Sequence, residues 1–487
     1  MPNANSLTKS AARGGLITIL AQGIRVPTLL LQVVILGRLV DPREYGLLAM
    51  VVTLTGVSTI LRDFGLSTSA LRSSTLSEQQ RTNLFWLNTA SGLVLAIIIF
   101  LLARPIAAFY DEPRLEYLAR WIAPTYFLSG LTAQFRVAIS RSLRFRSLAI
   151  CDVLPPIAAL IAAIPVARAG HGLAALIVLQ LSAPIVDLIL SVALAKWRPG
   201  LPRPAEGMRD LVSFGMGFAG TQLLSYLSRN IDSIAIGRVW GATPLGYYDR
   251  AYQLSGVPIN QINAPMTKVA LPVLSKVVND ESRFSRGLDS AQLLACYITT
   301  TVLFVGAGVA VPLIDVFLGP KWAEAAPLFA VLAIGSVFRA TQQIAIWLQV
   351  AKGAARSLFL GNLIGQPIII AAICAGLPWG SLGVAIGSAA GNAAFWVFSM
   401  IWAGRNTGFN TYPLIARAVR VISCVGAPAG LAAFFICSFS SAPSLLSLFL
   451  GISAAIVTLA IEWIFSKRTR IEVNTLVSFI RTGLGRG

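Results

Sequence analysis

Fourteen apolar stretches, each close to the length of a membrane-crossing helix, run through this chain of 487 residues. A helix needs about 20 apolar residues to cross roughly 30 Å of hydrocarbon, and charged or Gly/Pro-bearing loops separate these stretches. Apolar residues make up 56% of the chain and charged residues only 12%, far from the composition of a soluble domain. We therefore predict an all-α, polytopic membrane protein. The predicted spans are 14–36, 47–64, 84–103, 121–140, 150–166, 173–195, 211–236, 247–266, 291–314, 327–350, 358–377, 382–403, 421–439 and 445–465.

The first stretch is repeated 200 residues later. Aligning each residue with the one 200 positions further on gives the identical pairs Gly15/Gly215, Gln22/Gln222, Gly37/Gly237, Arg38/Arg238 and Gly46/Gly246. We predict two six-helix lobes related by this repeat, residues 1–200 and 201–405. A third segment, 406–487, adds two transmembrane helices and a basic cytoplasmic tail. Repeated membrane halves are typical of transporters whose site lies between the repeats at mid-depth.

The net charge of +19 is explained by membrane orientation. With the N-terminus in the cytoplasm, the loops and ends on the cytoplasmic side hold 25 of the 39 Lys and Arg residues. This bias follows the positive-inside rule, and it places both termini in the cytoplasm. Basic loops also favour contact with anionic membrane lipids. No basic segment is interleaved with stacking aromatic residues, so we expect no nucleic-acid partner.

Five arginines lie inside predicted spans, Arg25, Arg62, Arg136, Arg229 and Arg339, and three of them, Arg25, Arg229 and Arg339, are the candidates to contact a ligand. An arginine at the centre of a membrane helix costs roughly 2.5–3.5 kcal/mol, so these side chains need a compensating partner. A guanidinium can bind a phosphate through two parallel hydrogen bonds, which predicts a diphosphate site. The alternative is a structural role in a hydrated crevice. The polar residues expected to accompany them in the cavity are Gln22, Gln222 and Asn230.

Two carboxylates within spans, Asp187 and Asp232, are candidates to bind a coupling proton or cation. Asp232 follows Arg229 by three residues, on the same helical face, so the two side chains can instead neutralise each other. Prolines in the fifth and eighth spans, including Pro155, Pro156 and Pro258, are expected to break those helices.

Catalytic and cofactor motifs are missing from the sequence. The single histidine, His171, lies in a short AGHG loop, and the chain has no Walker A lysine, HExxH or GxSxG with partners. The five cysteines lie in or beside apolar spans without ligand spacing. We expect no enzyme activity, no cofactor and no metal.

Several stretches resemble a known family. They are LRDFGLSTSALRSS (61–74), LSEQQRTNLFWLN (76–88), SYLSRNIDSIAIGRVWGATPLGYYDRAYQL (225–254) and PVLSK (272–276). They resemble the Wzx-like oligosaccharide and polysaccharide flippases of the multidrug/oligosaccharidyl-lipid/polysaccharide exporter superfamily, most of all the exopolysaccharide branch. The resemblance implies two six-helix lobes around a central cavity that is lined with arginines, matching Arg25 and Arg229. It also implies a carboxylate at the position of Asp232 that binds a cation in some relatives.

The function implied by this resemblance is export of an undecaprenyl-diphosphate-linked oligosaccharide across the bacterial inner membrane, for exopolysaccharide or lipopolysaccharide synthesis. Its expected partners are the lipid-linked oligosaccharide, membrane lipids, and the polysaccharide polymerase and chain-length proteins. Two alternatives stay open at this point. One is a multidrug or cation antiporter of the same superfamily, and the other is a membrane polysaccharide polymerase or ligase.

Overall fold

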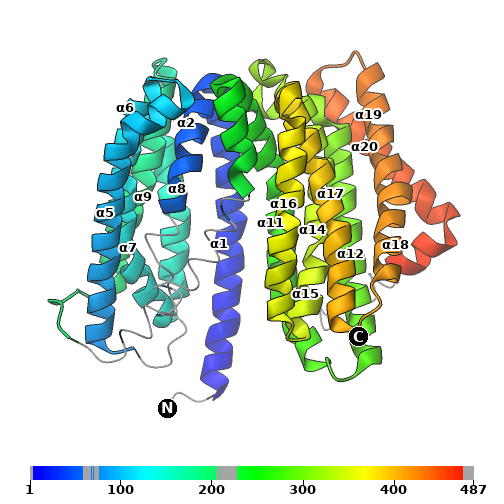
Figure 1. The fold of residues 1–487 in the computed structure, drawn as a ribbon, viewed down its shortest axis with the longest axis horizontal. Helices are drawn as coiled ribbons and strands as arrows, with labels where there is room; N and C mark the ends of the chain where they lie inside the picture. Colours follow the sequence, from blue (N-terminus) through cyan, green and yellow to red (C-terminus); the bar gives the residue numbers. More distant parts are fainter. Residues whose placement is uncertain are drawn as a thin grey trace. The chain divides into compact units, whose positions relative to one another are not determined.

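The computed structural model is built from long helices (Figure 1). It describes residues 4–58, 67, 70, 76–204, 208, 226 and 229–474. No residue within these ranges forms a strand, and the predicted all-α class is confirmed. Packing divides the chain into two compact units, Met1–Gly246 and Tyr247–Gly487. The lobe boundaries derived from the repeat stay a prediction, because residues 205–207 and 209–225 lie outside the described residues.

The first unit is a set of long helices packed side by side. Its helices are α1 (Ala4–Leu39), α2 (Pro42–Thr55), α5 (Glu78–Tyr110), α6 (Arg114–Ile122), α7 (Pro124–Arg141), α8 (Phe145–Arg168) and α9 (Gly172–Ala195), and residues 229–240 are also helical. α8 packs between α1 and α9, while α7 contacts both α5 and α9 (Figure 1). These contacts bring the charged residues of α7, α8 and α9 within reach of one another.

The second unit begins in the long helix α11 (Ala242–Lys276), whose first residues belong to the first unit. The helices that follow are α12 (Glu281–Gly308), α13 (Ala310–Leu318), α14 (Ala325–Thr341), α15 (Gln343–Ala351), α16 (Ala355–Gly376), α17 (Gly380–Thr407), α18 (Tyr412–Arg420), α19 (Ala427–Phe439) and α20 (Ser444–Phe465). Single turns at Pro320–Trp322 and Leu377–Trp379 and a π-helical segment, Val421–Gly426, connect some of them.

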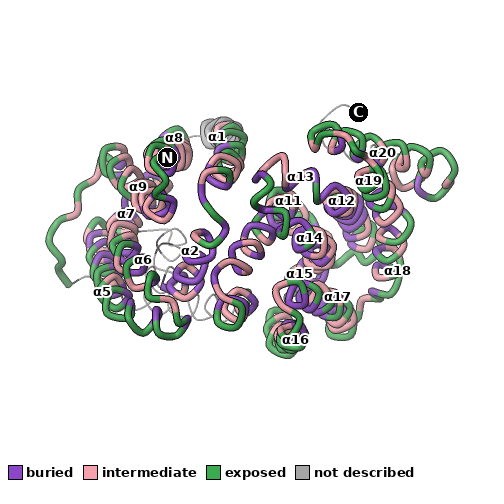
Figure 2. Tube along the Cα trace, turned by 90° about the horizontal axis from the view of Figure 1, so that it is seen from above, coloured by how far each residue is buried: buried purple, intermediate pink, exposed green. Residues whose placement is uncertain are grey.

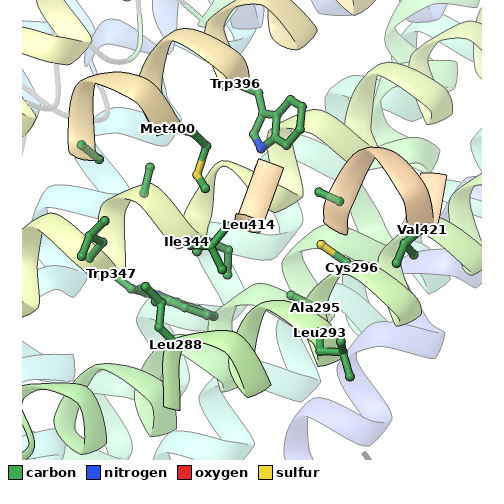
Figure 3. Close-up of a cluster of buried hydrophobic side chains, with 14 of the residues drawn as sticks. Leu288, Leu293, Ala295, Cys296, Ile344, Trp347, Trp396, Met400, Leu414 and Val421 are labelled. Atoms are coloured by element: carbon green, nitrogen blue, oxygen red, sulfur yellow. The ribbon is translucent and has the colours of Figure 1, made fainter. Parts of the chain in front are cut away.

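The core of the second unit is centred on α12. This helix packs against α14 and α19, and more of its residues are buried than in α16 or α20 (Figure 2). Apolar side chains from α12, α15, α17 and α18 meet in one cluster, in which Cys296, Trp347 and Met400 are almost completely buried (Figure 3). The alternation of buried and exposed faces in these helices fits a bundle that shows its outer helices to lipid.

Nine helical stretches in the described part of the chain are long and apolar enough to cross a membrane. One of them, Ala355–Thr407, combines α16 and α17 and covers two predicted spans. The predicted span 291–314 is divided at Val309, where α12 ends and α13 begins. The seventh predicted span lies mostly outside the described residues, so the number fourteen stays a prediction.

The prediction that prolines break the fifth and eighth helices is wrong. α8 runs without interruption through Pro155 and Pro156, and α11 runs through Pro258. A proline removes one backbone hydrogen bond, but neighbouring helices hold a membrane helix together around the missing bond. The Gln32 side chain of α1 also donates a hydrogen bond of 2.7 Å to the Pro156 carbonyl oxygen, which ties α8 to α1 at this level.

The internal repeat is visible in the backbone near residues 40 and 240. α1 ends at Leu39 and α2 begins at Pro42, while the helix 229–240 is followed by α11, which begins 200 residues after α2. The first turns of α2 and α11 cross each other at Gly46 and Gly246. A Cβ atom at Gly46 would lie 1.7 Å from the Ala242 carbonyl oxygen, and one at Gly246 would lie 2.0 Å from the Pro42 carbonyl oxygen. Equivalent positions of the repeat therefore make reciprocal contacts.

Candidate functional site

Arg25 lies inside the apolar part of α1. It shares one helical face with Ala21 and Thr28, which lie one turn to either side and are each only 7% exposed. The Arg25 side chain itself is exposed. Among the described residues, no hydrogen bond or ion pair engages its guanidinium. Arg25 therefore extends from a packed face of the helix, and no residue that the structure describes engages its five N–H donors. Gln22 is exposed in the preceding turn.

The second predicted cluster lies in the helix 229–240. Arg229 is exposed there, whereas Asp232, three residues later, is only 4% exposed. The Asp232 carboxylate accepts a hydrogen bond of 2.7 Å from the Ser233 backbone N–H. Asn230 donates to the Tyr226 carbonyl oxygen at 2.8 Å. On this helix the arginine is exposed and the aspartate is buried.

Tyr226 connects this region to α2. Its hydroxyl lies 3.2 Å from the Val52 carbonyl oxygen and 3.1 Å from that of Thr53, so the phenol donates to the end of α2. Gln222, another residue predicted for the cavity, lies outside the described residues.

Arg339 belongs to the second unit, at the end of α14. Its guanidinium donates a hydrogen bond of 2.5 Å to the Tyr252 hydroxyl and lies 5.0 Å from the centroid of the Tyr252 ring. Tyr252 in turn stacks on Tyr248. Both contacts come from α11, and together they hold the half-buried cation in one position.

Asp187 is part of an ion-pair triad that the sequence interpretation missed. Both of its carboxylate oxygens accept hydrogen bonds from Arg136 of α7, at 3.1 and 3.0 Å, and Arg136 also pairs with Asp152 of α8. Ser191 donates to Asp187 at 3.1 Å. One cation is shared by two carboxylates, so the triad carries a net negative charge when both are ionised. A signal was present in the sequence: three consecutive spans each carry one charged residue, and each lies in the half of its span nearer the predicted cytoplasmic face.

The described residues contain no group of three or more His, Cys, Asp and Glu side chains arranged to hold a metal ion. The arrangement instead offers exposed or aromatic-supported guanidinium groups in apolar helices. These groups can bind an anion such as a phosphate, and the low dielectric of the surroundings strengthens that attraction.

The sequence from residue 35 to residue 327 matches a family described as polysaccharide biosynthesis protein. The chain belongs to this family. The resemblance to polysaccharide transport proteins that the sequence motifs indicated is confirmed by individual relatives. The teichuronic acid biosynthesis protein TuaB of Bacillus subtilis (strain 168) is 29% identical over 73% of this chain and 74% of its own length.

Two further relatives have names that refer to other polysaccharides. The lipopolysaccharide biosynthesis protein WzxC of Escherichia coli (strain K12) is 23% identical over 78% of each chain. The succinoglycan biosynthesis transport protein ExoT of Rhizobium meliloti (strain 1021) is 25% identical over 62% of this chain and 61% of its own.

Solved structures of membrane transporters share the fold. The lipid II flippase MurJ, in an inward closed conformation, superimposes with a TM-score of 0.72, covering 93% of this chain and 99% of its own at 14% identity. A multidrug resistance MATE family transporter in an inward-facing conformation gives a TM-score of 0.61, covering 80% of this chain and 98% of its own, also at 14% identity. The fold is therefore that of a multi-pass membrane transporter.

Proposed function

We propose that this protein is a flippase for a lipid-linked oligosaccharide. It moves an undecaprenyl-diphosphate-linked repeat unit from the cytoplasmic to the outer leaflet of the bacterial inner membrane, for exopolysaccharide or lipopolysaccharide synthesis. Both termini lie in the cytoplasm, in agreement with the distribution of Lys and Arg residues. The polysaccharide polymerase and chain-length proteins then use the exported unit. This proposal is supported by membership of the family and by the polysaccharide transport role named for ExoT.

Arg25 is the observation that carries the proposal. A guanidinium that is exposed and engaged by no described residue, within an apolar helix, is maintained at a cost of roughly 2.5–3.5 kcal/mol. A diphosphate offsets this cost because its oxygens accept paired hydrogen bonds from the guanidinium. The chemistry of the carrier lipid, a doubly charged anion on an apolar tail, matches a cation placed in an apolar helix.

The other predicted residues complete the binding site in this proposal. Arg229 gives a second exposed cation for the diphosphate, and Arg339 gives a third whose orientation Tyr252 fixes. Gln22, Gln222 and Asn230 offer hydrogen-bonding groups to the sugars. The polyprenyl tail stays in lipid during the passage, so only the polar head needs a hydrated path.

Transport proceeds by alternating access, with the site open to one leaflet at a time. A ligand shifts such an equilibrium only if it binds the two states with different affinities. The diphosphate does so by neutralising arginines that repel one another when the site closes without ligand. Asp232 and Asp187 are the proposed sites for a coupling proton or cation. Asp232 is buried, and the Asp187 triad has one carboxylate more than its single arginine neutralises.

Replacing Arg25 tests the diphosphate site. We expect Arg25→Ala to abolish polymer secretion while the protein remains in the membrane at normal abundance. Arg25→Lys keeps the charge but loses the paired hydrogen bonds, so it should retain partial secretion. Arg43→Ala is the matched control, since it removes an arginine whose ion pair with Glu112 lies outside the proposed site. Normal secretion by Arg25→Ala would refute the role of this residue.

The coupling proposal has its own test. In everted vesicles with an ionophore, wild-type transport of the lipid-linked unit should fall as the ion gradient collapses. Asp232→Asn removes the charge without changing the shape of the side chain, and it should transport slowly with or without the gradient. The same comparison applies to Asp187→Asn. A variant that keeps full sensitivity to the ionophore would exclude that residue from coupling.

The two alternative functions make different predictions. A multidrug antiporter would export cationic dyes and would need an anionic site, whereas the predicted site is built from arginines. Dye efflux that depends on this protein would favour the antiporter. A polymerase or ligase would need chemistry at the sugar, and the fold matches transporters.

A further inference from the structure

A cleft of about 590 Å3 lies where α5 meets α6, and none of the residues proposed for transport lines it. Its walls include Phe100 of α5 and Glu116, Tyr117, Arg120 and Trp121 of α6. Figure 1 shows α6 beside the end of α5. α6 is amphipathic. Its residues Leu115, Leu118 and Ala119 are completely buried, so its aromatic and basic residues lie on the outer face of the helix.

The position of the cleft along α5 corresponds to a membrane interface. α5 has 33 residues and is about 50 Å long, which exceeds the roughly 30 Å of hydrocarbon. Its predicted apolar span ends at residue 103, immediately before Arg104. Tyr117 and Trp121 are about half exposed in the cleft. Exposed Tyr and Trp side chains at this level are typical of the aromatic belt between hydrocarbon and headgroups.

An exposed apolar stripe leads along α5 to this cleft. Leu93, Ile97 and Phe100 are spaced four and three residues apart, on one helical face, and each is about half exposed. Arg104 follows on the same face after four more residues, with 79% of its side chain exposed. The surface is therefore apolar over about two turns and basic at its end.

The basic end carries more positive than negative charge. Arg104 and Arg120 both pair with the same Glu116 oxygen, at 3.0 and 2.5 Å. Arg120 also lies 5.4 Å from the centroid of the Phe100 ring. One carboxylate balances only one of the two guanidinium groups. Glu112, in the turn before α6, is already paired with Arg43 at 2.8 Å.

We propose that the cleft and the stripe bind one anionic phospholipid. The phosphodiester occupies the cleft beside Arg104 and Arg120, and an acyl chain follows Phe100, Ile97 and Leu93. A soluble sugar would leave the apolar stripe uncovered, and a zwitterionic lipid would leave the excess positive charge unbalanced. The cleft shares no residue with the proposed transport site, so we assign it a structural or regulatory role.

Purified full-length protein in a neutral detergent gives a direct test. We expect phosphatidylglycerol to raise the thermal unfolding temperature saturably and to be retained in native mass spectrometry, while phosphatidylcholine does neither. The double variant Arg104→Gln/Arg120→Gln should weaken phosphatidylglycerol binding by more than tenfold, because each arginine near a headgroup contributes about fivefold. Arg283→Gln removes an ion-paired arginine outside the cleft and should bind as wild type.

Glu116→Gln should change the affinity for phosphatidylglycerol in the opposite direction. It removes the carboxylate that competes with the phosphate, so this variant should bind phosphatidylglycerol more tightly than wild type. The proposal would be overturned if phosphatidylglycerol and phosphatidylcholine raised the unfolding temperature equally. It would also be overturned if the double variant and Glu116→Gln both bound phosphatidylglycerol as wild type does. Equally tight displacement of phosphatidylglycerol by undecaprenyl diphosphate would assign the cleft to the transported carrier instead. None of these readouts depends on transport, so they stand apart from the test of the flippase function.

Discussion

Three of the arginines in the described helices occupy three different environments. Arg25 is exposed and engaged by no described residue, Arg339 is held by a tyrosine, and Arg136 is paired with two aspartates. The first environment suits a ligand that arrives and leaves, whereas the third stabilises the packing of three helices. The cost of placing an arginine in a membrane helix is thus met in different ways at different sites.

The Arg136 triad predicts a difference between two charge-removing variants. Arg136→Ala leaves Asp152 and Asp187 facing each other without a cation, and it should lower the free energy of unfolding by about 2 kcal/mol. This is less than the 3–5 kcal/mol of a fully buried pair, because the three side chains are 21–32% exposed. Asp152→Asn leaves one cation with one carboxylate and should change stability little. Thermal unfolding of both variants in detergent provides the measurement, and equal stability of both would contradict the role of the triad.

The sequence identified charged residues inside spans but not their partners. Arg136 is 16 residues from Asp152 and 51 from Asp187, and their contact depends on how three helices are rotated about their axes. Hydropathy determines the length of a span but constrains this rotation only weakly. Arg25 was easier to find, since a lone cation in an apolar stretch is visible without any knowledge of packing.

At the level of elements, most described helices agree with the apolar stretches. α9 covers the predicted span 173–195 almost residue for residue. Two helices differ from the predicted spans. α11 continues through Pro258, which was expected to break it, and the predicted span 291–314 is divided at Val309 between α12 and α13. The sequence repeat also predicted equivalent glycines, but only the structure shows that Gly46 and Gly246 mark a crossing of two helices.

The crossing predicts a severe effect of a very small substitution. Gly46→Ala would place a Cβ atom 1.7 Å from the Ala242 carbonyl oxygen, so α2 and α11 must move apart. We expect a loss of about 1–3 kcal/mol in the free energy of unfolding. Gly306→Ala in α12 is the control, because its Cβ would meet only the Phe329 ring at 3.6 Å and alanine favours the helix. Equal unfolding temperatures for the two variants would contradict a tight crossing at Gly46.

At the level of the whole molecule, the fold is shared by a lipid II flippase and a multidrug transporter, so the fold alone leaves the cargo open. The distinction rests on the site. A cationic drug is repelled by arginines, whereas a lipid diphosphate is attracted to them. The family match and the exposed Arg25 both favour the anionic cargo.

The distribution of lipid-linked repeat units between the two leaflets of the inner membrane tests the flippase most directly. In cells that lack this protein, the account predicts that these units accumulate in the cytoplasmic leaflet, and that wild-type protein but not Arg25→Ala restores them to the outer leaflet. Accumulation in the outer leaflet of the deletion strain would contradict the account, because it would place the missing step after translocation.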